Sequence, residues 1–126
     1  MLRFDWSAVE GQVITAVFGE HDVGHSWWAI AICIGCSAVV LRVNEDTDEI
    51  IVTHEPRPQP GADWKPVTGF EDWIGKHLSW CWVSRNSQGY LDMFTVALSD
   101  IGPSFAFVAA ASSLTCRRLM EFRITK

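Results

Sequence analysis

The chain has 126 residues, of which 48% are hydrophobic and 20% charged, and its formal net charge at pH 7 is −5. This length predicts a single domain over residues 1–126, and the apolar content excludes intrinsic disorder. The acidic balance argues against nucleic-acid binding, which requires a basic face, and permits a basic protein partner.

The start of the chain predicts a cytoplasmic protein. Residues 1–6 include charges where a signal peptide has its apolar core, so the four cysteines are expected to be reduced thiols. Two uncharged stretches, 26–41 and 101–116, are shorter than the roughly 20 apolar residues of a membrane-spanning helix. Because both are rich in β-branched, aromatic and small residues, we expect buried strands and no membrane contact.

The first half of the chain combines short turns with strand patterns. Asp5 is expected to cap a single helical turn that Gly11 closes. Residues 12–18, rich in β-branched side chains, predict the first strand. Residues 27–34 predict a central strand, because one face is large and apolar and the other small and apolar. The large face is expected to carry Trp28, Ile30, Ile32 and Ile34.

The clearest hairpin joins residues 39–44 to residues 50–53 through a polar turn. The prolines that follow predict an extended, irregular connection as far as Pro66. Thr68 and Glu71 have the spacing of a capping box, in which each side chain accepts a hydrogen bond from the other's backbone. This pair predicts one further helical turn.

The second half is predicted to be a series of strands separated by polar or glycine-containing turns. These strands are expected at residues 78–83, 90–98, 105–111 and 114–124. Leu78, Trp80 and Trp82 are predicted to share one face of the first of them. Together the patterns predict a mainly β protein with a minor helical part. It would be an antiparallel sheet, sandwich or open barrel of about eight short strands with one or two short helical turns.

Two groups of residues have the spacing of redox or metal sites. Cys33 and Cys36 form a C-x-x-C pair, but no helix or cation follows that would stabilise a thiolate, so we expect two buried thiols near a hairpin bend. His21, Asp22 and His25 are weak candidates for metal ligands, because glycines in their loop disfavour the helix that an H-x-x-x-H pair uses. No metal and no cofactor is therefore predicted.

Two features indicate binding to another protein. Glu45, Asp46, Asp48 and Glu49 concentrate negative charge at a hairpin tip that lacks the glycine and the length of a calcium loop. This tip is either a solvated turn or an acidic surface that docks on a basic partner. Trp64, which lies in the proline-containing connection, is predicted to be an exposed anchor for a partner or ligand.

An aromatic cleft is the alternative kind of binding site. It is expected to be lined by Trp80, Trp82, Tyr90, Asp92 and Phe94. Asp92 is expected either to be catalytic or to hydrogen-bond to Arg85 or Tyr90. An enzyme that uses Asp92, or His21 and His25, is a third alternative, although the chain has no nucleophile elbow and no phosphate-binding glycine loop.

Three motifs in the C-terminal half carry a family resemblance. They are W-x-W at Trp80 and Trp82, N-x-Q-G-Y-x-D from Asn86 to Asp92, and an S-x-L segment ending at Leu114 after the aromatic-rich residues 105–108. With them, residues 76–118 resemble a small bacterial family of single-domain proteins described as a domain of unknown function. The resemblance implies a bacterial setting and brings no activity or cofactor.

These observations predict a non-enzymatic bacterial protein-binding domain, in particular an immunity or inhibitor protein that neutralises a toxin. A small-molecule-binding β-domain with the aromatic cleft is the first alternative, and an enzyme of unknown class is the second. Edge strands of such a sheet can also pair across a two-fold axis, so a homodimer is a further possibility.

Overall fold

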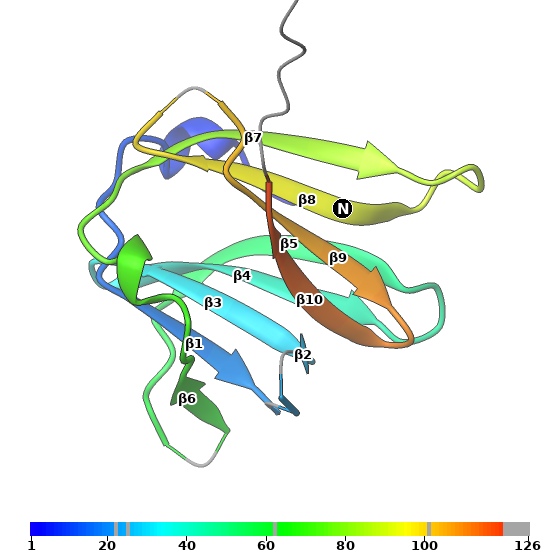
Figure 1. Cartoon of the computed structure of the whole chain (residues 1–126), viewed down its shortest axis with the longest axis horizontal. Helices are drawn as coiled ribbons and strands as arrows, with labels where there is room; N and C mark the ends of the chain where they lie inside the picture. Colours follow the sequence, from blue (N-terminus) through cyan, green and yellow to red (C-terminus); the bar gives the residue numbers. More distant parts are fainter. Residues whose placement is uncertain (22, 25, 62, 101, 120–126) are drawn as a thin grey trace, which may run out of the picture.

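The computed structural model describes residues 1–119 except 22, 25, 62 and 101. Two five-stranded antiparallel sheets pack face to face as a sandwich (Figure 1). The first sheet has the strand order β5-β4-β3-β1-β6, and the second has the order β2-β10-β9-β8-β7. The prediction of a mainly β fold is therefore confirmed, in its sandwich form, with more strands than the expected number.

Each sheet combines strands from both halves of the chain. The first sheet contains β1 (Ala16–Glu20), β3 (Ala29–Ile34), β4 (Ser37–Asn44), β5 (Glu49–Pro56) and β6 (Trp64–Pro66). The second sheet contains β2 (Ser26–Trp27), β7 (Leu78–Arg85), β8 (Leu91–Leu98), β9 (Phe105–Ala110) and β10 (Ser113–Arg118). The described residues also form two 3-10 turns, η1 (Trp6–Ala8) and η2 (Glu71–Trp73). Within the described residues, none of the helical segments has the length and hydropathy to cross a membrane.

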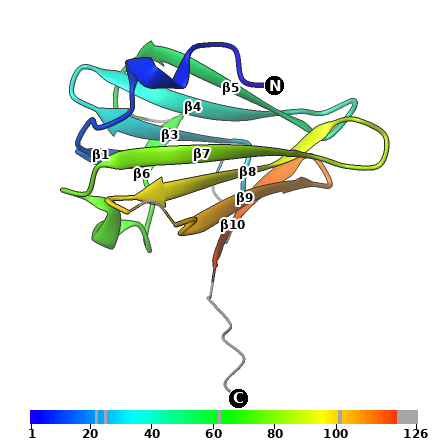
Figure 2. The ribbon, with the colours of Figure 1, turned by 90° about the horizontal axis from the view of Figure 1, so that it is seen from above.

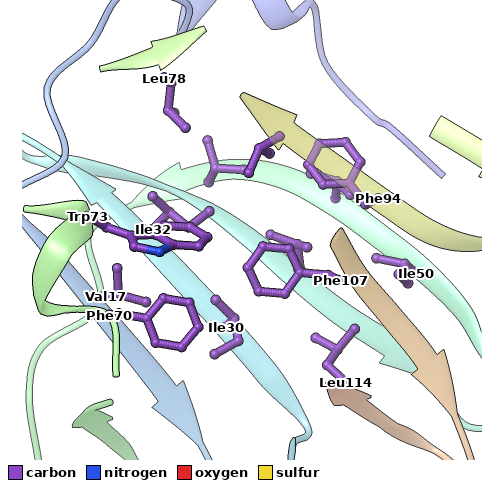
Figure 3. Packing of buried hydrophobic residues seen from close by; sticks show 14 of the residues in the cluster. Val17, Ile30, Ile32, Ile50, Phe70, Trp73, Leu78, Phe94, Phe107 and Leu114 are labelled. Carbon is purple, nitrogen blue, oxygen red and sulfur yellow. The ribbon is translucent and has the colours of Figure 1, made fainter. Parts of the chain in front are cut away.

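The core lies between the sheets and is built by side chains at every second strand position. Phe94 of β8 lies opposite Phe107 of β9, and both are fully buried. Ile30 and Ile32 reach the same cluster from β3 (Figure 3). Trp73 closes one side of the sandwich from η2 and contacts the Phe107 ring at 5.8 Å between centroids. The alternation that predicted the strands thus also builds the core.

The predicted strand over residues 27–34 is divided at Trp28. Trp27 belongs to β2 and pairs with β10 of the second sheet, whereas Ala29 begins β3 in the first sheet. The chain therefore changes sheets at Trp28, a corner that sandwiches use to connect their layers. Trp28 is 49% exposed, so its predicted place on the core face with Ile30 is wrong, whereas the core position of the isoleucines is confirmed.

Both predicted helical turns are present, but only the cap of η1 is the predicted one. Asp5 caps η1 through a 3.0 Å hydrogen bond from the Ser7 backbone N–H, which lowers the pKa of the Asp5 carboxyl. At η2 the capping box is wrong, because Glu71 accepts from the Gly69 N–H at 2.9 Å and Thr68 is not the N-cap.

Two strands begin or turn differently from their predicted patterns. The first strand starts at Ala16, and Val13 forms only an isolated bridge with His77. In β7 the register shifts between Leu78 and Cys81. This irregularity lets both Leu78 and Cys81 contact the core, so Leu78 does not share a face with Trp80 as predicted. Residues 120–124 of the last predicted strand lie outside the described residues.

Candidate functional site

The outer face of the second sheet is a surface of tryptophan, small and uncharged residues. Register places Trp82 opposite Thr95, Thr95 opposite Ala106, and Ala106 opposite Arg117, so these four side chains form one row across the face. A neighbouring row contains Ser84, Met93, Val108 and Thr115. We call these two rows, together with Trp80, the tryptophan face. Arg117 is its one charged member.

The two tryptophans of this face lie side by side on β7. Their ring centroids are 6.4 Å apart, and Trp80 is 51% exposed although it belongs to a strand of the sandwich. Beside them, Thr95 and Ala106 are buried although they point away from the core. A large indole next to such small side chains covers them and leaves a shallow apolar surface.

No connection of the described chain crosses the tryptophan face. From β7 to β10, each strand of the second sheet is joined to its neighbour in the sheet by a short hairpin or turn (Figures 1 and 2). Such turns stay at the ends of the strands. Among the described residues, no connecting segment therefore covers the outward side chains of this sheet.

The outer face of the first sheet is covered by the chain itself. β5 and β6 lie at opposite edges of that sheet, and the connection between them begins beside the β3–β4 turn, where the Arg57 N–H donates to the Cys36 carbonyl at 2.9 Å. Arg57, at the start of this connection, places its guanidinium 5.5 Å from the centroid of the Phe18 ring and donates to Thr15 Oγ1 at 3.2 Å. Under this cover, Phe18, Ala31, Cys33, Ala38 and Val40 form a second buried cluster.

Trp64 packs against this second cluster from β6. Its main chain pairs with Glu20 of β1, and its side chain is only partly exposed. Much of the indole that was predicted to anchor a partner therefore packs on the first sheet and helps to cover it.

The acidic hairpin tip divides into an internal and an exposed half. Asp48 Oδ1 accepts a hydrogen bond from the Ser112 N–H at 2.7 Å, in the turn between β9 and β10. Glu49 Oε2 accepts from the Leu91 N–H at 3.4 Å, at the start of β8. These two carboxylates hold the hairpin tip against the second sheet. Glu45 and Asp46 are exposed and remain the pair that a basic partner would meet.

The residues of the predicted aromatic cleft are spread over three places. Trp80 and Trp82 lie on the outer face of the second sheet, whereas Phe94 is fully buried on its inner face. Tyr90 precedes β8 at the end of the β7–β8 turn, and Asp92 is the second residue of β8. There Asp92 accepts a 3.4 Å hydrogen bond from the Asn86 side chain, and not from the predicted donors Arg85 or Tyr90.

An aromatic-walled cavity exists elsewhere, at the η2 end of the sandwich. Its volume is about 630 Å³, and its apolar lining includes Trp27, Phe70, Trp73 and Phe105. Lys76, Arg118, Asp72 and Asp100 supply charged groups to the lining. The sequence did not reveal this cavity, because its walls come from segments far apart in the chain. Trp27 adds a buried indole N–H that has no acceptor among the described residues.

The C-x-x-C pair is not a pair of buried thiols. Cys33 is buried in the second cluster, and this burial raises the pKa of its thiol. Cys36 lies in the β3–β4 turn, as predicted, but it is exposed, so its predicted burial is wrong. All four cysteines are free thiols. Burial also raises the pKa of Cys116 to about 12.

The predicted metal loop is described only in part. His21 stacks on Trp28 with 3.8 Å between ring centroids, while Asp22 and His25 lie outside the described residues. Over the part of the chain that the structure describes, no three His, Cys, Asp or Glu side chains are grouped to hold a metal ion.

Ser99 and His77 are in contact where the end of β8 lies beside the start of β7. Ser99 Oγ accepts the His77 backbone N–H at 2.9 Å and lies 3.5 Å from His77 Nδ1. The Ser99 N–H in turn donates to the His77 carbonyl at 2.8 Å. This reciprocal backbone pairing ties the end of β8 to the start of β7, which accounts for the contact between the two side chains.

By architecture the chain is a small antiparallel β-sandwich with one covered and one open outer face. It belongs to DUF6334, a family of unknown function whose model matches residues 1–123. The expectation of membership in such a family is confirmed, and the match extends over the N-terminal half that the three motifs did not cover. No curated protein and no solved structure matches the chain.

Proposed function

We propose that the protein is a non-enzymatic protein-binding domain and that it contacts its partner through the tryptophan face. The observation that carries this proposal is Trp80, which is 51% exposed and adjacent to Trp82 on a face that no described connection crosses. Tryptophans in such positions are the residues on which protein interfaces most often depend. A solvated sheet face of a monomer would alternate polar and charged side chains here.

The composition of the face defines the partner surface that fits it. An apolar patch would cover the two indoles, and an acidic side chain would pair with Arg117 at the far end of the row. Of the roles that such binding serves, we favour an immunity or inhibitor protein that neutralises a bacterial toxin. The small size and the absence of a catalytic motif in the sequence are consistent with this role.

The test compares the wild-type protein with variants that lack the indoles and asks which of them retains a bound partner. The Trp80→Ser/Trp82→Ser double variant should lose an equimolar partner that the wild-type protein retains through gel filtration, because both central contacts are gone. Trp28→Ser is the matched control, since Trp28 is 49% exposed on a different part of the surface. Retention of the partner by a correctly folded double variant would refute the proposal.

The acidic hairpin provides the second arm of the same experiment. If a basic partner docks on the hairpin tip, the Glu45→Lys/Asp46→Lys variant should lose the complex while the tryptophan variant keeps it. If the tryptophan face carries the binding, the pattern of loss is reversed. The immunity role predicts that the product of the neighbouring gene is a toxin that stops growth. Co-expression of the wild-type protein should restore growth, and co-expression of the tryptophan variant should not.

Binding of a small molecule is a second candidate function, favoured by the cavity of about 630 Å³. This volume lies in the range of ligand sites, its aromatic walls suit an aromatic ring, and Lys76 and Arg118, which share the lining with Asp72 and Asp100, are the groups that a carboxylate would contact. Titration of intrinsic tryptophan fluorescence with a panel of aromatic carboxylates tests this function. A saturable change that the Lys76→Gln/Arg118→Gln variant loses would support it, and a flat response across the panel would contradict it.

A further inference from the structure

The two sheets have four edge strands, and three of them are blocked against pairing. Residues at the start of the chain cover β5, where the Arg3 N–H donates to the Val52 carbonyl at 2.9 Å and the Val52 N–H donates to the Met1 carbonyl at 2.8 Å. β6 has three residues and ends at Pro66, and β2 has two residues. Short strands, prolines and covering segments are the usual protections of a sheet edge.

The fourth edge, β7, is covered by other segments only at its beginning, and its pairing with β8 shifts register near both ends, between Leu78 and Cys81 and between Ser84 and Arg85. The Gly11 N–H donates to the Leu78 carbonyl at 2.7 Å, and Trp6 Nε1 donates to the Ser79 carbonyl at 2.6 Å. Across the described residues, no backbone hydrogen bond joins the outer edge of β7 from Trp80 to Arg85 to another segment. Figure 1 shows β7 at the upper edge of the second sheet, next to β8.

The residues along this open edge have the uncharged, partly apolar character that is typical of a strand paired on both sides. From Trp80 to Ser84 the strand has no charge, and Val83 is 45% exposed. An edge strand that remains solvated usually has a lysine, a proline or an inward-pointing charge at such positions. Backbone donors and acceptors that are unpaired and flanked by apolar side chains form a template for another strand.

The charges at the two ends of the open edge complement each other. Arg85 marks the end of β7, and Glu10 lies near its beginning, where it lines a hollow together with Leu78, Ser79 and Trp80. Burial raises the pKa of Cys81 to about 11, and the Glu10 carboxylate contributes to this increase, which places its charge close to β7. A second β7 in antiparallel orientation would bring its Arg85 to this Glu10, and the reverse pair would form at the other end.

We propose that β7 pairs antiparallel with β7 of a second copy of this chain, across a two-fold axis near Trp82 and Val83. The five strands of each second sheet then form one continuous sheet. Such an interface is self-complementary, as a two-fold axis requires, and it places the two Arg85 side chains at opposite ends. Because strand pairing alone buries less surface than a standard interface, dimer formation depends on concentration. The tryptophan faces of both copies become one surface.

The mass in solution tests this proposal. Sedimentation velocity over a wide range of protein concentration should show a shift from 14.1 kDa to twice that mass. Val83→Lys should abolish the shift, because it places a charge on each strand close to the axis. Val23→Lys is the matched control, since Val23 is 63% exposed and lies far from β7 in the sandwich. It should dimerise like the wild-type protein.

A charge exchange separates the proposed pairing from loss of folding. Arg85→Glu should weaken the dimer at least tenfold in its dissociation constant, and the Glu10→Lys/Arg85→Glu double variant should restore it. A structural role of Arg85 within one chain would not be rescued in this way.

Hydrogen exchange locates the interface without any substitution. Amides of residues 80–85 should exchange more slowly at high concentration, whereas those of β5 should not change. A monomer at every concentration, or a dimer that Val83→Lys leaves intact with unchanged exchange in β7, would overturn the proposal. Partner capture through the tryptophan face does not require the dimer, so the Val83→Lys variant should still retain the partner, and the two proposals can fail separately.

Discussion

The two outer faces of the sandwich differ in what the chain does with apolar side chains that point away from the core. On the first sheet, Phe18 is buried beneath the connection from β5 to β6, with Arg57 over its ring. On the second sheet, Trp80 is half exposed, and no described connection crosses it. Strand order contributes to the difference, because β5 and β6 at opposite edges need a long connection, from which Arg57 reaches Phe18, whereas β7 to β10 are joined by short turns. Apolar residues on a covered face serve folding, whereas those on an open face are available for binding.

The largest expected effect is a loss of stability at the covered face. Phe18→Ala should lower the free energy of unfolding by about 3 kcal/mol, because it removes a buried ring and leaves a cavity. Trp80→Ala should lower it by less than about 1 kcal/mol, because half of the indole is already in solvent. Urea denaturation of the two variants measures both values. Equal losses would remove the distinction between the faces.

A smaller loss is expected from the residue that covers Phe18. Arg57→Ala should lower the free energy of unfolding by about 1 kcal/mol, because the cation–π contact and the hydrogen bond to Thr15 are lost. Arg57→Lys should retain part of this stability, since the positive charge remains. If Arg57→Ala is as stable as the wild-type protein in the same urea experiment, the connection does not hold the cover in place.

The smallest effect concerns the ion pair of Arg42 and Glu55 on the outer face of the first sheet, at its β5 edge. The Arg42 guanidinium, with the Thr53 hydroxyl, lowers the pKa of the Glu55 carboxyl below its usual value of 4.5. The pair therefore stabilises the folded state above that pH, and the stabilisation is lost as the pH falls through the lower folded pKa. Glu55→Gln should cost less than about 1 kcal/mol at neutral pH, because both side chains are partly exposed. Unfolding curves of the two proteins should converge at acidic pH.

Period-two alternation predicted the hairpins and the core positions well. The strands over Phe94 and Phe107 and the hairpin around the acidic turn follow directly from it. The corner at Trp28 was missed because the whole segment is apolar, so no polar residue marks the change of sheet. The irregularity before Cys81 was missed for a similar reason, since a bulge shifts the alternation without any glycine or proline.

The candidate site was predictable only in part. Sequence alone placed Trp80 and Trp82 on one face, but it paired them with Leu78 and with a cleft. Whether that face is open depends on the strand order of the second sheet, and whether Trp64 is free depends on how the first sheet is covered. Both are long-range properties that local patterns do not contain. The cavity beside Trp73 depends in the same way on segments that only the fold brings together.

The most direct test of the open face is hydroxyl-radical footprinting of the protein alone and in its isolated complex. In the free protein, Trp80 and Trp28 should be oxidised rapidly, because both are about half exposed, and the buried Trp73 should react slowly. On complex formation, oxidation of Trp80 and Trp82 should fall strongly while that of Trp28 stays the same. Protection of Glu45, Asp46 or Trp64, with Trp80 and Trp82 as reactive as before, would contradict the account.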